Sequence, residues 1–541
     1  MKKLLVLAMM ATLLMAGSAF AVNRNLTPIP DATFQFGAPG VASGPTTTNN
    51  DDSCDIGVAP AATLLLPYFE VDFTNRTQDT LFTITNVSRF PQIAHCTVWT
   101  DWSFPVLDFN IYLTGYDVQG ISMNAVLNGT IGAATGTGPT QAVSPLGALS
   151  SGFTNNPNFS GGGATIGCAT QPGPLSAAIV AALRTALTTG VYNAGTGASC
   201  PQLVGGTHAN AIGYVTVDVT NACNQLLPTD PNYYANFILF DNVLIGDYQQ
   251  LGPAAQGTTA SSFDAGGNAM VHIRAVPEGG PAGTPLAGAQ TNLPYTFYDR
   301  YTPALNRTLD RRQPLPALWA ARFIQGGTGA FATNYKIWRE GFGAGACGAS
   351  LAANGVLSVA DVVRFDEHEN PNTTSPCLVS PCPTTSTPLM PETSIQNTNS
   401  SNFPPINASG DVGGWMYLNL NNGGSTGYSV TRNVGGVPTI ITGAGSTSNL
   451  VTGSGTVGPR PSQNWVIVEM FGTAASGNRL TVDFDAAWLG NGCSAAVGVT
   501  GLPPGAPAIG PAGGVPVCPG NDPACTPGVA PYTGTNTTPT P

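Results

Sequence analysis

Thr80-Leu81-Phe82-Thr83-Ile84-Thr85 is the stretch that decides the fold class. Apolar and polar side chains alternate along it, which is the period of a strand with one face on a core and the other in water. The same alternation returns at 95–102 and 108–113, and Asn, Ser and Pro residues interrupt the chain between these runs. Short alternating strands with such interruptions are typical of antiparallel β-sandwiches. The sequence therefore predicts a mainly β protein.

Comparable runs along the rest of the chain predict two domains. Strands are expected at 64–72, 213–219, 236–240, 270–274, 320–324, 335–339, 415–420, 464–470 and 480–485. We expect two immunoglobulin-like antiparallel β-sandwich domains, at 54–300 and 301–500, with long loops rich in Gly, Pro, Thr and Asn. The Gly- and Thr-rich stretch 421–462 is expected to be loop with one hairpin.

One helix is predicted inside an insertion of the first domain, which spans about 128–210. Apolar residues recur every four positions over 175–189 and share one helical face: Leu175, Ile179, Leu183 and Leu187. Pro174 precedes them, and proline suits the start of a helix.

The N-terminus has the three parts of a bacterial export signal. Lys2 and Lys3 precede an apolar run at 4–15, and Ala19-Phe20-Ala21 is an A-x-A cleavage site. Residues 1–21 are therefore expected to be a signal peptide. The mature chain should lie outside the cytoplasm, in the periplasm, at the cell surface or in the medium. Polar, Pro- and Gly-rich stretches are expected to flank the domains as a leader and a tail, at 22–53 and 501–541.

Charged residues make up only 9% of the chain, and the net charge is −11. The 18 Lys and Arg residues form no basic cluster, so we expect no nucleic-acid partner and no anionic membrane surface as partner. No second apolar run approaches the ~20 residues that cross a bilayer, so no membrane span is expected. Asn, Thr, Ser and Gln supply the polar surface instead, and such surfaces repel neighbouring copies weakly. Self-association or a cell-surface partner is therefore predicted.

Eleven cysteines in an exported protein favour disulfides over metal sites, and none of them forms a C-x-x-C pair. Cysteines that are neighbours in sequence and bracket a loop or a helix are expected to pair: Cys168–Cys200, Cys377–Cys382 and Cys518–Cys525. The odd number leaves at least one thiol unpaired or paired between chains.

Segments of the first half resemble a segment of uncharacterised secreted bacterial proteins. They are PYFEVD at 67–72, VWTDW at 98–102 and LTGYDVQ at 113–119, and the likeness extends to FDAAWL at 484–489. No activity is attached to that group, so the resemblance implies no catalytic residue. The strands also resemble immunoglobulin-like domains in general form, without the Cys…Trp…Cys spacing of true immunoglobulin domains.

Sequence motifs of common enzymes are absent. There is no Gly-x-Ser-x-Gly elbow, no His-Glu-x-x-His site and no phosphate-binding loop, so we predict no catalytic residue, cofactor or metal. His95 and His272 fall inside expected strands, where a buried histidine bonded to a neighbour is the simplest interpretation. His368 lies in Asp366-Glu367-His368-Glu369-Asn370, which fits a solvated acidic loop and, as an alternative, a divalent-ion site.

Paired carboxylates keep a hydrolase open as a hypothesis. Glu70 and Asp72 share one face of an expected strand. A secreted glycoside hydrolase would need two such acids, from Glu70, Asp72 and Asp101, on either side of a cleft. Asp483 and Asp485 also share a face, for which a polar outer surface is the simplest explanation.

The aromatic residues keep a binding function open. Trp99 and Trp102 have opposite parity, so one of them could face outward and stack on a sugar or a partner chain. The favoured hypothesis is a secreted, non-catalytic structural or surface-interaction protein. A carbohydrate-binding protein with exposed Trp or Tyr is the first alternative, and the glycoside hydrolase is the second. An aromatic strip on one sheet would favour carbohydrate binding, whereas scattered buried Trp would favour the structural role.

Overall fold

The computed structural model describes residues 59–500 with gaps, of which the shorter span one to four residues. The longer gaps are 130–174, 194–199, 253–265, 276–295, 301–309, 341–356, 374–386, 404–411, 452–456, 474–478 and 491–498. The predicted signal peptide, leader and tail lie outside the described residues.

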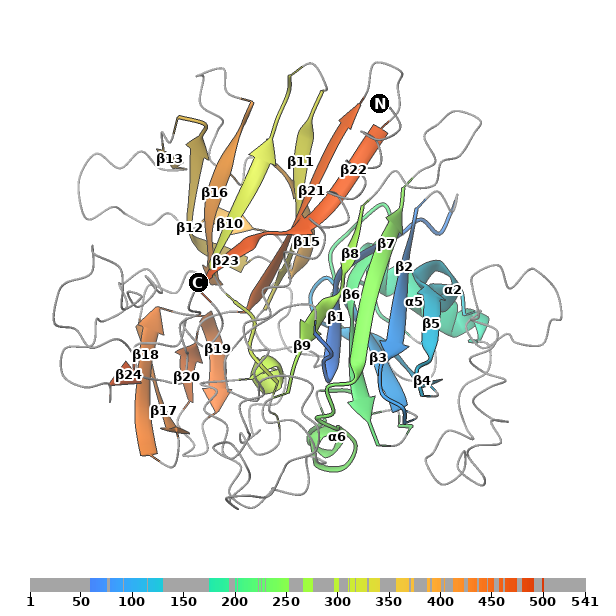
Figure 1. Ribbon diagram of the computed structural model, residues 1–541. Helices are drawn as coiled ribbons and strands as arrows, with labels where there is room; N and C mark the ends of the chain where they lie inside the picture. The colour runs from blue at the N-terminus through green and yellow to red at the C-terminus, as the bar shows by residue number, and fades with distance from the viewer. Residues whose placement is uncertain are drawn as a thin grey trace, which may run out of the picture.

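The fold is mainly β, as predicted, and the described strands pair antiparallel. Strands from the first half of the chain form two sheets (Figure 1). The five-stranded sheet has the order β4 (Pro105–Leu113), β3 (Gln92–Thr100), β6 (Ala211–Thr220), β1 (Thr63–Val71) and β9 (Val271–Ile273). The four-stranded sheet has the order β5 (Val118–Ser122), β2 (Asp79–Asn86), β7 (Leu244–Leu251) and β8 (Gly267–Ala269).

Strands from the second half form the other sheets. The six-stranded sheet runs β13 (Pro371–Thr373), β12 (Leu357–Asp366), β16 (Gly413–Asn422), β10 (Leu318–Ile324) and β23 (Ala487–Gly490), with β14 (Thr387–Leu389) also on β12. A second four-stranded sheet, here the middle sheet, runs β15 (Thr393–Asn397), β11 (Ala332–Arg339), β21 (Asn464–Thr473) and β22 (Arg479–Asp485). Two small sheets hold β17 (Gly427–Val434), β18 (Val437–Ala444) and β24 (Val499–Thr500), and β19 (Ser446–Val451) with β20 (Val457–Arg460). The stretch expected to be mostly loop is therefore mostly strand.

The predicted helix is present as α5 (Ala177–Thr189). Ser176 begins it by accepting a hydrogen bond from the Ile179 N–H, and Gly190 ends it in the left-handed conformation. A Cβ atom on Gly190 would lie 2.0 Å from the Gly205 carbonyl oxygen, so only glycine fits there. The described part of the chain also contains the shorter helices α2 (Met123–Leu127) and α6 (Pro231–Asn236) and the 3₁₀ helix η3 (Phe297–Arg300).

The expected strand at 236–240 is wrong. Helix α6, whose N-cap is Asp230 and whose first residue is Pro231, ends at Asn236, and no strand follows it over 237–240. Only an isolated bridge between Thr220 and Ile238 keeps strand-like pairing in this stretch. The Asp-Pro start, a capping residue followed by proline, outweighs the apolar run that suggested a strand.

The middle sheet is covered on both faces. Tyr335 and Ile337 are buried on the face toward β10, and the Tyr335 hydroxyl donates to the Arg322 carbonyl oxygen at 3.1 Å. The opposite face meets the first half of the chain, where β1 contacts β11 and β15, and β8 contacts β22. Figure 1 shows β21 and β22 between the six-stranded sheet and the strands of the first half.

Side chains and backbone join the two halves in one continuous core. Trp338 on β11 is fully buried, and its ring lies 5.8 Å from Tyr214 and 5.7 Å from Phe297. The Asp101 carbonyl oxygen accepts a hydrogen bond from the Glu392 N–H at 2.8 Å. The Thr393 hydroxyl donates to the Pro67 carbonyl oxygen at 2.5 Å.

The described cysteines leave the predicted pairings open. Cys96 is buried and free, and burial raises the pKa of its thiol. Cys200 and Cys223 are each disulfide-bonded, but no disulfide joins two of these three described cysteines. The pairings Cys168–Cys200, Cys377–Cys382 and Cys518–Cys525 each involve a residue outside the described part of the chain, so they stay predictions.

His272 on β9 makes the fold sensitive to acid. The side chain is 2% exposed, and its Nε2 accepts a hydrogen bond from the Gly246 N–H at 3.1 Å. Burial lowers the pKa of His272 from 6.5 to about 4, although the Met270 backbone and Asp247 act in the opposite direction. The folded protein therefore holds this imidazole neutral at pH values where an unfolded chain protonates it.

Acid should destabilise the protein through this residue. Between pH 6.5 and about 4 the unfolded state binds the extra proton, so stability present above pH 6.5 is lost as the pH falls. The loss attributable to His272 should reach about 3 kcal/mol. Urea unfolding of the wild type and of His272→Gln at pH 7.5 and pH 4.5 measures it. Equal pH dependence in both proteins would contradict this assignment.

Candidate binding site

The six-stranded sheet presents aromatic and charged side chains on its outer face. Along β16, Met416, Leu418 and Leu420 are buried in the core, whereas Trp415 and Tyr417 alternate with them and are partly exposed. This is the period-2 pattern of a half-buried strand. Trp415 and Tyr417 therefore lie on the outer face of the sheet, and the buried residues that alternate with them lie on the inner face.

Cross-strand pairing places three of these outer residues in one row. Trp415 on β16 is paired with Arg322 on β10 and with Phe365 on β12. The Trp415 and Phe365 rings are stacked, with centroids 4.3 Å apart and planes 11° apart. Arg322 is exposed, whereas its neighbours Ala321 and Phe323 point into the core. One side of the indole is thus held against Phe365 in a fixed orientation.

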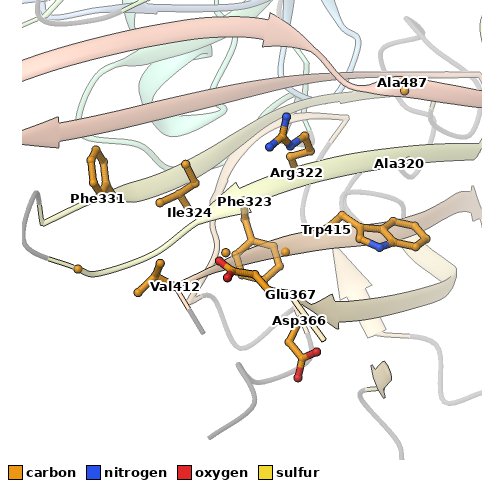
Figure 2. Close-up of a pocket in the computed structure, with 13 residues that line it drawn as sticks. Ala320, Arg322, Phe323, Ile324, Phe331, Asp366, Glu367, Val412, Trp415 and Ala487 are labelled. Atoms are coloured by element: carbon orange, nitrogen blue, oxygen red, sulfur yellow. The ribbon is translucent and has the colours of Figure 1, made fainter. Parts of the chain in front are cut away.

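A hollow of about 900 Å³ opens beside this row, at the end of β10 and the start of β16. Figure 2 shows Trp415 at one end of it and Phe331, Ile324 and Val412 at the other. Phe331 is 43% exposed and Val412 is 40% exposed, so the hollow has an accessible apolar end. The lining is completed by Ala320, Arg322, Phe323, Gly327, Asp366, Glu367, Gly413, Gly414 and Ala487.

Gly414 allows the strands beneath the hollow to approach closely. A Cβ atom at this position would lie 2.0 Å from the Phe365 carbonyl oxygen and 2.9 Å from the Phe323 ring. Any larger residue would force β16 away from β12. The glycine therefore allows β16 to lie close to β12 next to the stacked Trp415 and Phe365 rings.

The two acids of the lining have different surroundings. Glu367 is exposed, whereas Asp366 is buried and its carboxylate accepts a hydrogen bond from the His368 N–H at 2.9 Å. That bond closes the turn after β12, which agrees with the solvated-loop interpretation of this segment. Within the described residues no group of three His, Cys, Asp or Glu side chains could hold a metal ion.

The predicted aromatic contacts lie elsewhere and are not exposed together. Trp99 is fully buried: its Nε1 donates to the Thr216 hydroxyl at 2.9 Å, and its ring stacks on Tyr214 at 5.8 Å. Contact between Trp99 and a surface ligand is therefore ruled out, because β3 is buried on both faces. Trp102 follows β3 in a turn and is a partly buried residue packed against the core.

The acids of the hydrolase hypothesis are held by local bonds. Glu70 accepts hydrogen bonds from the Tyr68 hydroxyl at 2.8 Å and from the Asn210 amide at 2.6 Å. The Asp101 carboxylate accepts from the Gly206 N–H and contacts the His208 Nε2 at 2.8 Å. Neither acid lines the hollow.

Asp72 does not border the hollow, and Asp483 does not lie on the polar outer surface expected for Asp483 and Asp485. Asp72 is buried and accepts a hydrogen bond from the Thr74 N–H in the turn after β1. Asp483 is buried between the two halves rather than on an outer surface. Asp485 accepts from the Trp465 Nε1 and the Asn268 amide, both at 3.0 Å. None of these acids belongs to the hollow.

Sequence reasoning missed most of the hollow. The parity of Trp415 against Met416 and Leu418 indicates an outward side chain and was the one available signal. Arg322 and Phe365 join it only through pairing of strands that are distant in sequence. Phe365 also lies on β12, a strand that the sequence pattern did not reveal.

Comparison of the chain with protein-family models, curated proteins and solved structures finds no match. Within the described residues, no helix has the length and apolar character needed to cross a membrane. The function must therefore be argued from the site itself.

Proposed function

We propose that this chain is an exported, non-catalytic surface-interaction protein that binds carbohydrate in the hollow on β10 and β16. The observation that carries the proposal is the partly exposed Trp415, stacked on Phe365 and bordering the hollow. Sugars offer flat C–H faces that pack on an indole ring, while their hydroxyls need polar partners. Arg322 and Glu367 supply a donor and an acceptor beside that ring.

The size and fixed geometry of the hollow support this assignment. Its volume of about 900 Å³ suits a short oligosaccharide, because small-ligand sites usually measure about 300–1,000 Å³. Trp415 is oriented before any ligand binds, since its ring is stacked on Phe365. A preformed ring loses little side-chain freedom on binding, which favours affinity.

The lining favours binding over hydrolysis. Glycoside hydrolysis usually needs two carboxylates on either side of the scissile bond. Among the lining residues only Glu367 offers an exposed carboxylate, because Asp366 is buried and engaged in a turn. Within the described residues, the hydrolase alternative therefore has no second exposed acid at this hollow.

The surrounding fold suits a surface-interaction role. We infer two sandwiches with immunoglobulin-like organisation, because β1 packs against β2 and β7, and β10 packs against β11 and β21. Together with the export signal and the low charge, this architecture fits a component that works outside the cytoplasm. Self-association remains a separate prediction of the low charge.

Loss of the Trp415 ring should weaken sugar binding. Trp415→Ala is expected to weaken binding at least about tenfold, since a stacking contact of ~1.4 kcal/mol or more disappears. Isothermal titration of the mature protein with cello-, xylo- and chito-oligosaccharides measures the effect. The wild type should bind at least one of these neutral probes.

Trp102→Ala is the matched control, because it removes a partly buried Trp outside the hollow. It should leave the affinity unchanged. A wild type that binds none of the probes, or equal affinity in Trp415→Ala, would contradict the binding proposal. Release of shorter sugars from a bound probe would contradict the non-catalytic part.

A further inference from the structure

A lysine and two carboxylates meet on the inner face of the middle sheet. Lys336 lies on β11, Glu469 on the neighbouring β21, and Asp483 on the next strand, β22. Glu469 is paired directly with Asp483, and Lys336 is two residues along from Asn334, the other pairing partner of Glu469. Because neighbouring strands lie ~4.8 Å apart, one lysine and one aspartate side chain can together bridge from β11 to β22.

The three side chains are in direct contact. The Lys336 Nζ lies 2.6 Å from the Asp483 Oδ2 and 3.1 Å from the Glu469 Oε1. Further bonds fix both acids: the Asn334 amide donates to Glu469 at 2.8 Å, and the Tyr248 hydroxyl donates to Asp483 at 3.3 Å. The amine is therefore held against one carboxyl group while a second carboxylate stands beside it.

Water is excluded from this cluster. The side chains of Lys336 and Asp483 are 1% and 0% exposed, and the Glu469 side chain is 7% exposed. The second carboxyl oxygen of Asp483, Oδ1, has no hydrogen-bond partner among the described residues. Gly266 packs on the same carboxyl group, since a Cβ atom there would lie 2.1 Å from Oδ1.

Burial favours the protonated form of Asp483. It raises the pKa of Asp483, and Glu469 adds to the rise, whereas Lys336 opposes it. Transfer of one proton from the ammonium to the carboxylate removes both charges from a place where water cannot solvate them. A free amine and a carboxylic acid are the reactants of amide formation, so the step must begin with this proton transfer.

We propose that Lys336 and Asp483 condense to an intramolecular amide bond, with Glu469 as the proton carrier. The Lys336 Nζ attacks the Asp483 Cγ, and a new Nζ–Cγ bond forms. Glu469 takes a proton from the nitrogen and returns it to the departing hydroxyl, so the Cγ–O bond breaks and water leaves. Nothing is oxidised or reduced, Glu469 ends unchanged, and no further reactant is needed. Fixed contact between the groups replaces the activation that amide formation needs in water.

The bond would tie β11 to β22 across β21. Residues 336 and 483 bracket most of the second half of the chain, so that half would become a covalently closed loop that cannot be pulled out strand by strand. This modification is independent of the proposed sugar site, which lies on a different sheet.

Mass spectrometry of the reduced, mature full-length chain tests the proposal. The linked chain should weigh one water molecule less than its sequence, and trypsin should fail to cleave after Lys336. Tandem fragmentation of a tryptic and chymotryptic digest should show the peptide containing Lys336 joined to the peptide containing Asp483. A folded wild-type chain of full sequence mass, cleaved normally after Lys336, would overturn the proposal and leave an ion pair.

Variants separate the roles within the cluster. Lys336→Arg keeps a cation but should remove the link, and Glu469→Gln should slow its formation about 100-fold or more. Asp485→Asn is the matched control, because Asp485 is the next acid on β22 and bonds to Trp465 and Asn268 instead. It should form the link as the wild type does. Unchanged link formation in Glu469→Gln would overturn the role of that residue.

Discussion

Methionine in place of Arg312 is expected to lower the free energy of unfolding by about 3–5 kcal/mol. Arg312 is fully buried and lies 3.4 Å from the Asp218 carboxylate and 3.2 Å from the Asp310 carboxylate. The Arg312 guanidinium also packs over the Phe240 and Tyr298 rings, at 5.3 and 5.5 Å. Its removal leaves two buried carboxylates without their cation.

Asp218 explains why the cost should be large. It lies in the middle of the five-stranded sheet, 1% exposed, and accepts hydrogen bonds from the Tyr233 and Tyr298 hydroxyls at 2.7 and 2.8 Å and from the Thr63 hydroxyl. These neutral donors cannot balance a full charge in a dry site. Asp218 and Arg312 therefore connect parts of the chain that are far apart in sequence, from Thr63 on β1 to Arg312 itself.

Equilibrium unfolding in urea measures the loss. Arg322→Met is the matched control, because Arg322 is exposed at the hollow, and it should change stability by less than about 0.5 kcal/mol. Asp218→Asn combined with Arg312→Met should cost less than the sum of the single changes, since one of the two carboxylates that lose the guanidinium is no longer charged. Equal costs for Arg312→Met and Arg322→Met would contradict the assignment.

Alanine in place of Trp338 should cost about 3–5 kcal/mol and weaken the coupling between the two halves. The indole lies between Tyr214 of the first half and Phe297 of the connecting segment. A cavity there removes contacts on both sides of the junction at once. The wild type should unfold in one calorimetric transition, and Trp338→Ala in two.

Trp488→Ala serves as the comparison, because Trp488 is only partly buried and packs near Trp465 within the second half. It should lower stability less and keep a single transition. One transition in Trp338→Ala, with the stability of Trp488→Ala, would show that this ring does not couple the halves.

The alternation of apolar and polar residues was enough to predict strands that have one face in the core and the other in contact with solvent. Residues 79–86 alternate between buried and half-buried, as the alternation at Thr80-Leu81-Phe82-Thr83-Ile84-Thr85 indicates. The helix predicted at 175–189 was equally readable from apolar residues that recur every four positions, and the structure has it at Ala177–Thr189. These elements need no information from distant parts of the chain.

Strands buried on both faces, or containing charges, were harder to interpret. On β12, Arg364 is buried and donates to the Thr398 carbonyl oxygen at 2.5 Å. A charged residue therefore occupies a position that points into the core. Lys336 is likewise buried, because the first half of the chain covers that face of the middle sheet. Such burial follows from packing between distant segments, which a single sequence does not reveal.

The candidate site shows the same division. The alternation of Trp415 with buried residues on its own strand indicates that its side chain points outward. Its neighbours on the next strands depend on how β10 and β12 are aligned with β16. Arg322 and Phe365 are 93 and 50 residues away from Trp415 in sequence. Only the order β12-β16-β10 brings them to one row.

The position of the middle sheet also determines the order in which the molecule can be assembled. The two sheets of the first half are complete once β9 ends at Ile273, whereas the strands that cover them come later: β11 and β15 cover β1, and β22 covers β8. When the chain is made from its N-terminus, the surface formed by β1 and β8 stays uncovered until the last third of the chain has been made. Pairing between such distant segments is slow, because loop closure precedes any gain in contacts. A chain truncated before β22 would retain an open apolar surface, on which other copies could aggregate.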